Sequence, residues 1–109
     1  MSEKTIFEKV VSREIPGTFI YEDEKYAVIK NINPEAPIHY LAIPKKAVPA
    51  ITDLKQEDLH IPGDLIKVAK EVLKKENIEN FKLIFNGGKY LHLPEHLHLH
   101  IVAGEDLEN

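Results

Sequence analysis

Apolar residues recur along the chain with two periods, and each period predicts a different kind of element. Between residues 64 and 77 they recur every three or four positions, with lysine and glutamate on the other side, which predicts the main amphipathic helix. The apolar stripe of this helix consists of Leu65, Val68, Ala69, Val72 and Leu73. A shorter stripe of the same kind ends at Ile15-Pro16-Gly17 and predicts a short helix near the N-terminus.

Five other segments have the apolar, aromatic and β-branched composition of strands. They are residues 18–21, 26–30, 38–43, 81–85 and 96–102. A polar stretch joins the first two, which is typical of a hairpin, and Pro44 is expected to end the third. We therefore expect an α+β fold in which a mostly antiparallel, five-stranded sheet carries the main helix on one face.

The segment before the main helix carries a second helix signal. Asp53 followed by Gln56 resembles a capping box, which predicts a helical run from Leu54 onward. Pro62-Gly63 is expected either to break this run or to restart it, and from Asp64 the signal of the main helix is clear.

Length, charge and composition narrow the class of protein. A chain of 109 residues is long enough for one domain, and we expect residues 1–109 to form it. The formal net charge of −4 disfavours binding to extended nucleic acid. The chain has no cysteine, which excludes a disulfide framework and a cysteine nucleophile. It has neither an apolar run of membrane-spanning length nor a signal-peptide layout at its start, so a cytoplasmic protein is the expectation.

Histidine is concentrated in one segment, since four of the six histidines fall between His92 and His100. From residue 96 to residue 102 histidine alternates with apolar residues, which on a strand places His96, His98 and His100 on one face. The leucine and isoleucine side chains of the other face can pack against the main helix. Three imidazoles contribute little to a core, and a solvated strand face more often carries lysine, threonine or glutamate. This face is therefore a candidate functional site.

Three interpretations of these histidines remain open on the residues alone. The first is an ordinary solvated strand face. The second is a metal site in which two of the three act together with His39, because alternate residues of a strand lie ~6.6 Å apart and three in a row cannot easily converge on one ion. The third is nucleophilic catalysis at phosphorus, in which one neutral imidazole attacks and its neighbours transfer protons.

The string His96-Leu97-His98-Leu99-His100-Ile101-Val102 resembles the signature of the histidine triad (HIT) family of nucleotide-binding hydrolases and transferases, in which three histidines alternate with apolar residues. The resemblance covers most of the chain. Ala36-Pro37 followed by His39, and then Ile43-Pro44-Lys45-Lys46, look like the Hint branch of the family, the purine nucleoside phosphoramidase type.

The resemblance implies a role for each matching polar residue. His98 would be the nucleophile that becomes nucleotidylated, and His100 would contact the α-phosphate. His96 and His39 would support the hydrogen bonds of the active site. Asn86 matches an asparagine on the side of the phosphate or the leaving group.

The base and the ribose of a nucleotide have their own matching positions. Six apolar residues match the slot that holds a purine base: Ile6, Phe7, Val10, Ile15, Ile29 and Ile32. Core packing is the alternative for these residues, and it is the favoured one for Val10 and Ile15. Asn31 stands where the family usually has an aspartate that holds the ribose hydroxyls; its amide can still form hydrogen bonds but supplies no charge.

The chain departs from the family pattern in the loop before the triad. Near Leu93 relatives carry polar groups that touch the phosphate, and a leucine cannot donate a hydrogen bond. The zinc-binding cysteines of some relatives are missing too, so neither a structural metal nor another cofactor is expected. His60 matches nothing catalytic and is expected at the surface, while Lys45 and Lys46 either steer an anionic substrate or simply end a strand.

Taken as a whole, the resemblance implies a hydrolase that cleaves purine nucleoside 5′-phosphoramidates, of the AMP-amine type, through a nucleotidyl-histidine intermediate. It also implies a homodimer whose two sheets join at exposed edges. The alternatives are a dinucleoside polyphosphate hydrolase of the same family, a nucleotide-binding module with little turnover, and a metal-binding module.

Overall fold

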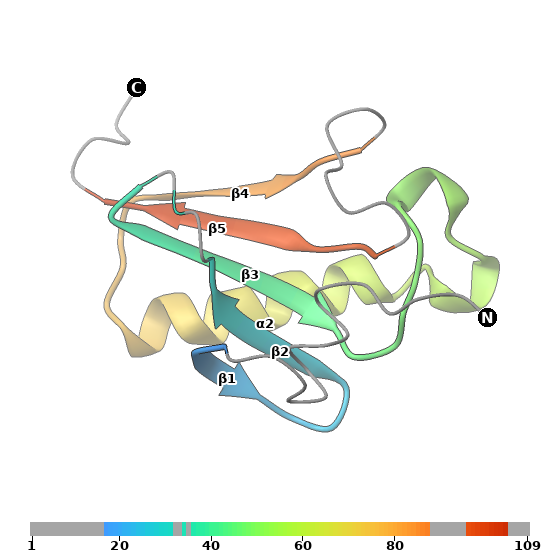
Figure 1. The fold of residues 1–109 in the computed structure, drawn as a ribbon, viewed down its shortest axis with the longest axis horizontal. Coiled ribbons are helices and arrows are strands. Elements are labelled where there is room, and N and C mark those ends of the chain that lie inside the picture. Colours follow the sequence, from blue (N-terminus) through green and yellow to red (C-terminus); the bar gives the residue numbers. More distant parts are fainter. Residues whose placement is uncertain (1–16, 32–33, 35, 88–95, 105–109) are drawn as a thin grey trace.

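The computed structural model describes residues 17–31, 34, 36–87 and 96–104. Within these ranges five strands form one sheet in the order β1-β2-β3-β5-β4, every neighbouring pair is antiparallel, and α2 lies across one face (Figure 1). The elements are β1 (Phe19–Glu22), β2 (Tyr26–Lys30), β3 (Ile38–Pro44), η1 (Ile51–Asp53), η2 (Gln56–Asp58), α2 (Ile61–Lys75), β4 (Phe81–Phe85) and β5 (Leu99–Ala103). The predicted α+β fold is confirmed, while the short helix predicted near the N-terminus lies outside the described residues.

The apolar stripe of α2 faces the sheet, as its spacing predicts. All five residues of the stripe are buried, and they form one core with apolar side chains of β2, β3 and β5. Each fully buried leucine or valine in such a contact contributes roughly 1.5–3 kcal/mol. The opposite side of the helix is charged. Among the described residues, no helix combines the length and the apolar character that crossing a bilayer requires.

The two ends of α2 explain where the helix begins and stops. Pro62 and Gly63 lie in its first turn, where a proline loses no hydrogen bond, so of the two expected alternatives the chain restarts as a helix here. At the other end Asn77 adopts a positive φ of 56°. The backbone N–H of Ile78 then donates to Leu73 O at 2.9 Å, which satisfies one of the last carbonyls of the helix.

The segment between β3 and α2 differs from its prediction. Instead of a helical run from Leu54 there are two separate 3₁₀ turns, η1 and η2, with extended backbone at Leu54 and Lys55 between them. The predicted capping box is wrong because Asp53 ends η1 rather than beginning a helix, and neither turn has a side-chain cap. The buried carboxylate of this segment is Asp58, which accepts a hydrogen bond from Nζ of Lys46 at 2.8 Å.

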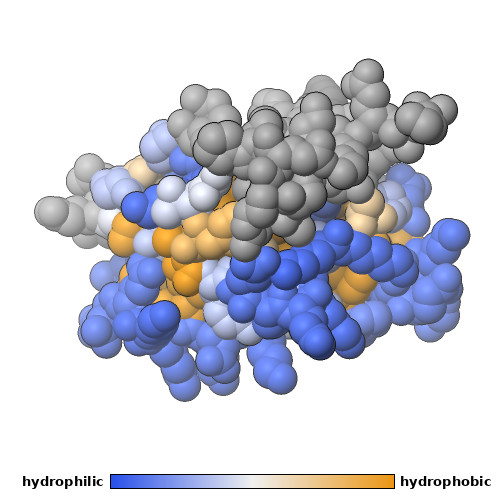
Figure 2. Space-filling view, turned by 60° about the horizontal axis from the view of Figure 1, so that its bottom comes forward, coloured by the Kyte–Doolittle hydropathy of each residue, from blue (hydrophilic) through white to orange (hydrophobic). Residues whose placement is uncertain are grey.

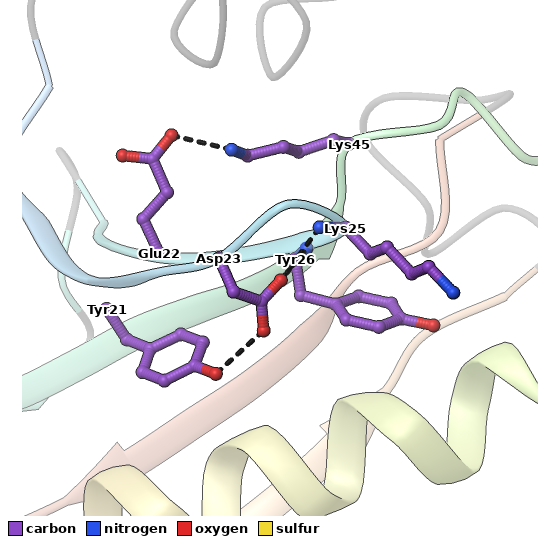
Figure 3. Close-up of polar contacts among 6 residues, drawn as sticks. All are labelled: Tyr21, Glu22, Asp23, Lys25, Tyr26 and Lys45. Carbon is purple, nitrogen blue, oxygen red and sulfur yellow. Dashed lines mark hydrogen bonds and ion pairs between the residues drawn. The ribbon is translucent and has the colours of Figure 1, made fainter.

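The hairpin between β1 and β2 is closed by one carboxylate (Figure 3). Oδ1 of Asp23 accepts hydrogen bonds from the backbone N–H groups of Lys25 and Tyr26 at 2.8 and 2.7 Å, and Oδ2 accepts one from the hydroxyl of Tyr21 at 2.7 Å. Desolvation opposes ionisation here, but these hydrogen bonds together hold the pKa of Asp23 below its usual range. This turn fixes where β2 begins.

The last strand starts later than predicted. β5 begins at Leu99, so the prediction that this strand starts at His96 is wrong. The reason is that the backbone N–H of Leu97 donates to Val48 O at 2.9 Å, beyond the end of β3, rather than to a residue of a neighbouring strand. Residues 96–98 therefore lead into the sheet without belonging to it.

Two tyrosines of the sheet fasten α2 near both of its ends. The hydroxyl of Tyr26 donates to Oδ2 of Asp64 at 2.6 Å, and the hydroxyl of Tyr40 donates to Oε1 of Glu76 at 2.6 Å. Burial, followed by the hydrogen bond to Glu76, raises the pKa of Tyr40 to about 12. Burial and the hydrogen bond to Asp64 likewise raise the pKa of Tyr26 well above its ordinary value. Both phenols are held in their neutral form by the fold.

The Tyr40 contact predicts a loss of stability at alkaline pH. The pKa of this phenol is 10.0 in its ordinary state and about 12 in the folded chain, so its contribution is complete below pH 10 and is lost as the pH rises toward 12. We expect Tyr40→Phe to lower the free energy of unfolding at pH 7 by about 1 kcal/mol and to flatten the alkaline decline. Urea titrations at a series of pH values measure both effects.

The matched control is Tyr21→Phe, which removes an exposed hydroxyl from the hairpin without touching α2. It is expected to change the free energy of unfolding by about 0.5 kcal/mol or less. An alkaline decline that is as steep in Tyr40→Phe as in the original chain would show that the contact with Glu76 is not its source.

Candidate active site

The sheet face that points away from α2 carries the histidines, and we call it the histidine face. Side chains alternate along a strand, and Tyr40 and Ala42 of β3 belong to the helix-side core, so His39 and Leu41 point the other way. By the same alternation Leu99 and Ile101 of β5 pack under α2, which leaves His100 on the histidine face. Residues 39 and 100 thus meet across the β3–β5 pair.

Four polar side chains form a row across this face. Nε2 of His39 lies 2.8 Å from Nδ1 of His100. Nδ2 of Asn31 lies 3.2 Å from the same Nε2 of His39, and Nδ2 of Asn86 lies 3.2 Å from Nε2 of His100. Asn31 follows β2 and Asn86 follows β4, so four adjacent strands each contribute one residue. The structure therefore brings together four of the residues that the sequence singled out.

His98 lies beside this row with a defined orientation. Its ring centroid is 4.9 Å from that of His100, in an edge-on arrangement. Nδ1 of His98 lies 3.0 Å from the backbone carbonyl oxygen of His96. A carbonyl oxygen only accepts, so Nδ1 of His98 must carry the proton. In the neutral ring the lone pair is consequently on Nε2, which is the tautomer that a nucleophilic imidazole needs.

His96 is fully buried and holds the approach to β5 in place. Its Nε2 lies 3.1 Å from the carbonyl oxygen of Pro44, and because that oxygen only accepts, Nε2 of His96 is the donor. Together with the backbone bond from Leu97 to Val48, this contact ties residues 96–98 to the end of β3 and to the segment that follows it. The carbonyl of His96 that orients His98 is therefore itself fixed. No residue pattern could have identified the carbonyl of Pro44 as the partner, since any residue type supplies one.

The expected slot for a purine base lies only partly within the described residues. Ile29 is buried and points to the histidine face, where it pairs with Leu41 in register. The other expected slot residues lie outside the described residues: Ile6, Phe7, Val10, Ile15 and Ile32. Leu93, where the chain departs from the family pattern, lies outside them as well.

The two lysines after β3 are both paired with carboxylates. Nζ of Lys45 lies 2.7 Å from Oε2 of Glu22 (Figure 3), and Nζ of Lys46 lies 2.8 Å from Oδ1 of Asp58. These pairs are consistent with lysines that fasten a strand end. His60 is exposed, as expected.

The arrangement has the chemistry of a site for nucleophilic attack on an electrophilic atom that carries anionic oxygens. It combines a neutral imidazole with its lone pair on Nε2, a second imidazole beside it, and two amide groups that can donate hydrogen bonds. The nitrogens of His39 and His100 that face each other share a proton, as their 2.8 Å separation indicates. Among the described residues, no group of three histidine, aspartate or glutamate side chains is arranged to hold a metal ion.

Known proteins resemble the chain over almost its whole length. A family model described as "Scavenger mRNA decapping enzyme C-term binding" matches residues 4–107. An uncharacterized HIT-like protein of Synechocystis sp. is 42% identical over 106 residues, which cover 95% of this chain and 93% of that protein. The purine nucleoside phosphoramidase of Escherichia coli is 34% identical over 113 residues, which cover 98% of this chain and 92% of that enzyme.

A solved structure shares the fold as well. A HIT family hydrolase from Clostridium thermocellum matches with a TM-score of 0.89 and 35% identity, and the match covers 100% of this chain and 97% of that one. Sequence, fold and the row of histidines thus lead to the same assignment. The chain belongs to the histidine triad family and, within it, to the Hint-like branch.

Proposed function

We propose that this histidine triad hydrolase cleaves purine nucleoside 5′-phosphoramidates and releases the nucleoside monophosphate. The observation that carries the proposal is the hydrogen bond from Nδ1 of His98 to the carbonyl of His96, because it leaves the lone pair on Nε2. The similarity to a purine nucleoside phosphoramidase at 34% identity supports the choice of substrate class.

In the first step of the proposed reaction, Nε2 of His98 attacks the α-phosphorus. A bond forms between this nitrogen and phosphorus while the bond from phosphorus to the amine breaks, and the amine leaves with a proton supplied by solvent water. The proton on Nδ1 of His98 stays hydrogen-bonded to the carbonyl of His96, so the positive charge that develops on the ring is stabilised. We assign the contacts with the phosphoryl oxygens to Asn86, through its Nδ2, and to His100 when its Nε2 carries a proton.

In the second step water attacks the same phosphorus and the bond to Nε2 of His98 breaks. The water adds its oxygen to the phosphoryl group and gives up a proton to Nε2 of His100, which passes it on to solvent. The nucleoside monophosphate is released, and His98 is neutral again. For the rest of the substrate we assign the ribose hydroxyls to Asn31 and the base to an apolar slot of Ile29 with Ile6, Phe7 and Ile32.

We further propose that two copies of the chain join through β4. This strand lies at the edge of the sheet, and its Phe81 and Ile84 are partly exposed apolar residues. Beside it an apolar groove of about 380 Å³ lies between α2 and β4, lined by Ile66, Leu73, Ile78, Phe81, Leu83 and the stems of two lysines. Figure 2 shows apolar surface flanked by hydrophilic side chains on one side of the molecule. A second copy paired edge to edge would extend the sheet and cover this groove.

The mechanism predicts a covalent intermediate that depends on His98. After brief mixing with an adenosine 5′-phosphoramidate, intact-protein mass spectrometry should detect a mass gain equal to one AMP group, followed by AMP release. His98→Ala should form no adduct and lose at least about a thousandfold of its turnover, because a removed nucleophile cannot be replaced by its neighbours. Binding of AMP, measured by calorimetry, should persist in this variant.

His60→Ala is the matched control, since His60 is exposed and far from the row of histidines in sequence. It should form the adduct at the original rate. Substantial turnover in His98→Ala would show that the nucleophile is assigned to the wrong residue. AMP binding with neither adduct nor turnover in the original chain would indicate a nucleotide-binding module instead of an enzyme.

The proposed interface predicts that a charge in the groove separates the two copies. Phe81→Glu places a carboxylate on the edge strand, and we expect sedimentation velocity to show a monomer at micromolar concentration where the original chain sediments as a dimer. Ile51→Glu is the control, because Ile51 and Phe81 are both 43% exposed but Ile51 lies in η1, away from β4. A monomer in the original chain, or a dimer in both variants, would contradict the proposal.

A further inference from the structure

We propose that Asn31 is a positioning residue that sets the direction of the hydrogen bonds through His39 and His100. Its amide holds the pair in the tautomers in which Nε2 of His100 accepts a hydrogen bond and does not donate one. The consequence for catalysis rests on the proposed function, but the arrangement of protons can be tested without any substrate.

The contacts of the row determine where each proton lies. Nδ2 of Asn31 can only donate, so Nε2 of His39, 3.2 Å away, accepts and carries no proton. The proton between the two rings, across 2.8 Å, must then belong to Nδ1 of His100. A neutral His100 with its proton on Nδ1 has a bare Nε2, which accepts from Nδ2 of Asn86 at 3.2 Å. Each of these contacts therefore contains one proton. Asn31 and His100 both donate to Nε2 of His39, and Asn86 donates to Nε2 of His100, so the two asparagines favour the same tautomers.

Of the two asparagines, Asn31 is the one tied firmly to the pair. Its backbone N–H donates to the carbonyl of His39 at 2.9 Å, which continues the β2–β3 ladder by one residue. Its side chain follows that of Ile29 on the histidine face, since the two are alternate residues of the same extended segment. Asn86, by contrast, follows an edge strand and precedes Gly87. The backbone of position 31 is thus held beside His39, and Nδ2 of its side chain lies next to Nε2 of that ring.

The charged and titratable groups near the pair favour its neutral form. From β2, Lys30 is exposed and points to the other face; β3 supplies no charged neighbour on this face next to His39. From β4, Lys82 pairs in register with Val102, which is two residues after His100 along β5. Lys82 therefore lies on the same face of the sheet as His100. Among the residues that the structure describes, the ring of His98 is the remaining titratable neighbour, at 4.9 Å. The charges of α2 lie beyond the sheet. Because Lys82 is cationic and His98 can become so, an added proton on the pair would be repelled.

A carboxylate at position 31 would reverse this arrangement with almost no change of shape. An ionised aspartate only accepts, so it would favour a proton on Nε2 of His39. Nδ1 of His100 would then lose its acceptor, and the neutral His100 would place its proton on Nε2. Alternatively the pair would take up one more proton, because a negative charge at this distance stabilises an imidazolium. In either case Nε2 of His39 becomes protonated.

The protonation of Nε2 decides whether His100 can accept a proton or donate one during the reaction. With a bare Nε2, His100 can accept a proton, for example from the water that attacks the nucleotidyl intermediate. With a proton on Nε2, it can only donate to a phosphoryl oxygen or a leaving group. The uncharged amide of Asn31 therefore selects the accepting form for the resting site, while the affinity for the ribose is a separate property of the same side chain.

The test is a long-range ¹H–¹⁵N correlation spectrum of the full chain, labelled with ¹⁵N in its histidine rings, without substrate at neutral pH. Such spectra distinguish a protonated ring nitrogen from a bare one. We expect Nε2 of His39 and Nε2 of His100 to be bare and Nδ1 of His100 to be protonated. In Asn31→Asp, Nε2 of His39 should be protonated, whereas His60, which is exposed, should give unchanged signals and serves as the internal control.

The kinetic counterpart is the pH dependence of kcat/KM. In Asn31→Asp its acidic limb should move to higher pH by about one unit, because the carboxylate stabilises the protonated pair. Asn31→Ala removes the amide without adding charge; it should give a mixture of tautomers and leave the limb nearly in place. A merely structural role for Asn31 would lower stability without moving either the limb or the ring signals.

The outcomes separate this inference from the proposed function. A protonated Nε2 of His39 in the original chain, or the same ring signals in the original chain and Asn31→Asp, would overturn the inference. The spectrum of the original chain is decisive alone if a variant does not fold. Expected ring signals together with no AMP adduct on His98 would instead uphold the inference and overturn the proposed function.

Discussion

A backbone carbonyl can only accept a hydrogen bond, and at two points of this fold a carbonyl decides which nitrogen of a histidine carries the proton. The carbonyl oxygen of His96 accepts a hydrogen bond from Nδ1–H of His98, and the carbonyl oxygen of Pro44 accepts one from Nε2–H of His96. Neither acceptor can reverse its role, whereas a side-chain amide could rotate. The tautomer of the nucleophilic ring is therefore determined by the path of the main chain.

That path depends in turn on packing at some distance from the histidines. The stretch from 96 to 98 is not part of a strand, and it is fastened through His96 and Leu97 to the end of β3 and to the segment after it. The same segment is joined to η2 by the pair of Lys46 and Asp58. On the other face of the sheet, Tyr26 and Tyr40 hold α2 at both ends. The site is thus a local irregularity supported by a regular frame.

Sequence periodicity predicted the frame well because it reports burial on one face. The stripe of α2, the strands 26–30 and 81–85 and the antiparallel sheet all follow from which side chains avoid water. The errors fall where main-chain contacts decide. Asp53 ends a turn instead of opening a helix, and β5 starts only at Leu99 because Leu97 has another backbone partner.

The candidate site was predictable in its residue types but not in its connections. The alternation of histidines drew attention to His98 and His100, and the family resemblance added His39, Asn31 and Asn86. The contact between Asn31 and His39 depends on the register of β2 against β3, which one sequence does not contain. The burial of His96 depends on a carbonyl, which has no signature in the sequence at all.

The row of four polar residues is assembled from strands that differ in how easily they open. His39 and His100 sit on two of the three strands that have neighbours on both sides, and 61 positions separate them in the chain, so their contact forms only after long-range pairing is complete. Asn86 follows an edge strand, which is where local unfolding is easiest. Fraying of that edge would remove one amide while the histidine pair stays intact. The fraction of molecules in which Asn86 contacts His100 therefore depends on how firmly β4 is held in the sheet. A strand paired with this edge would raise that fraction, and so affect the reaction, without contacting a histidine.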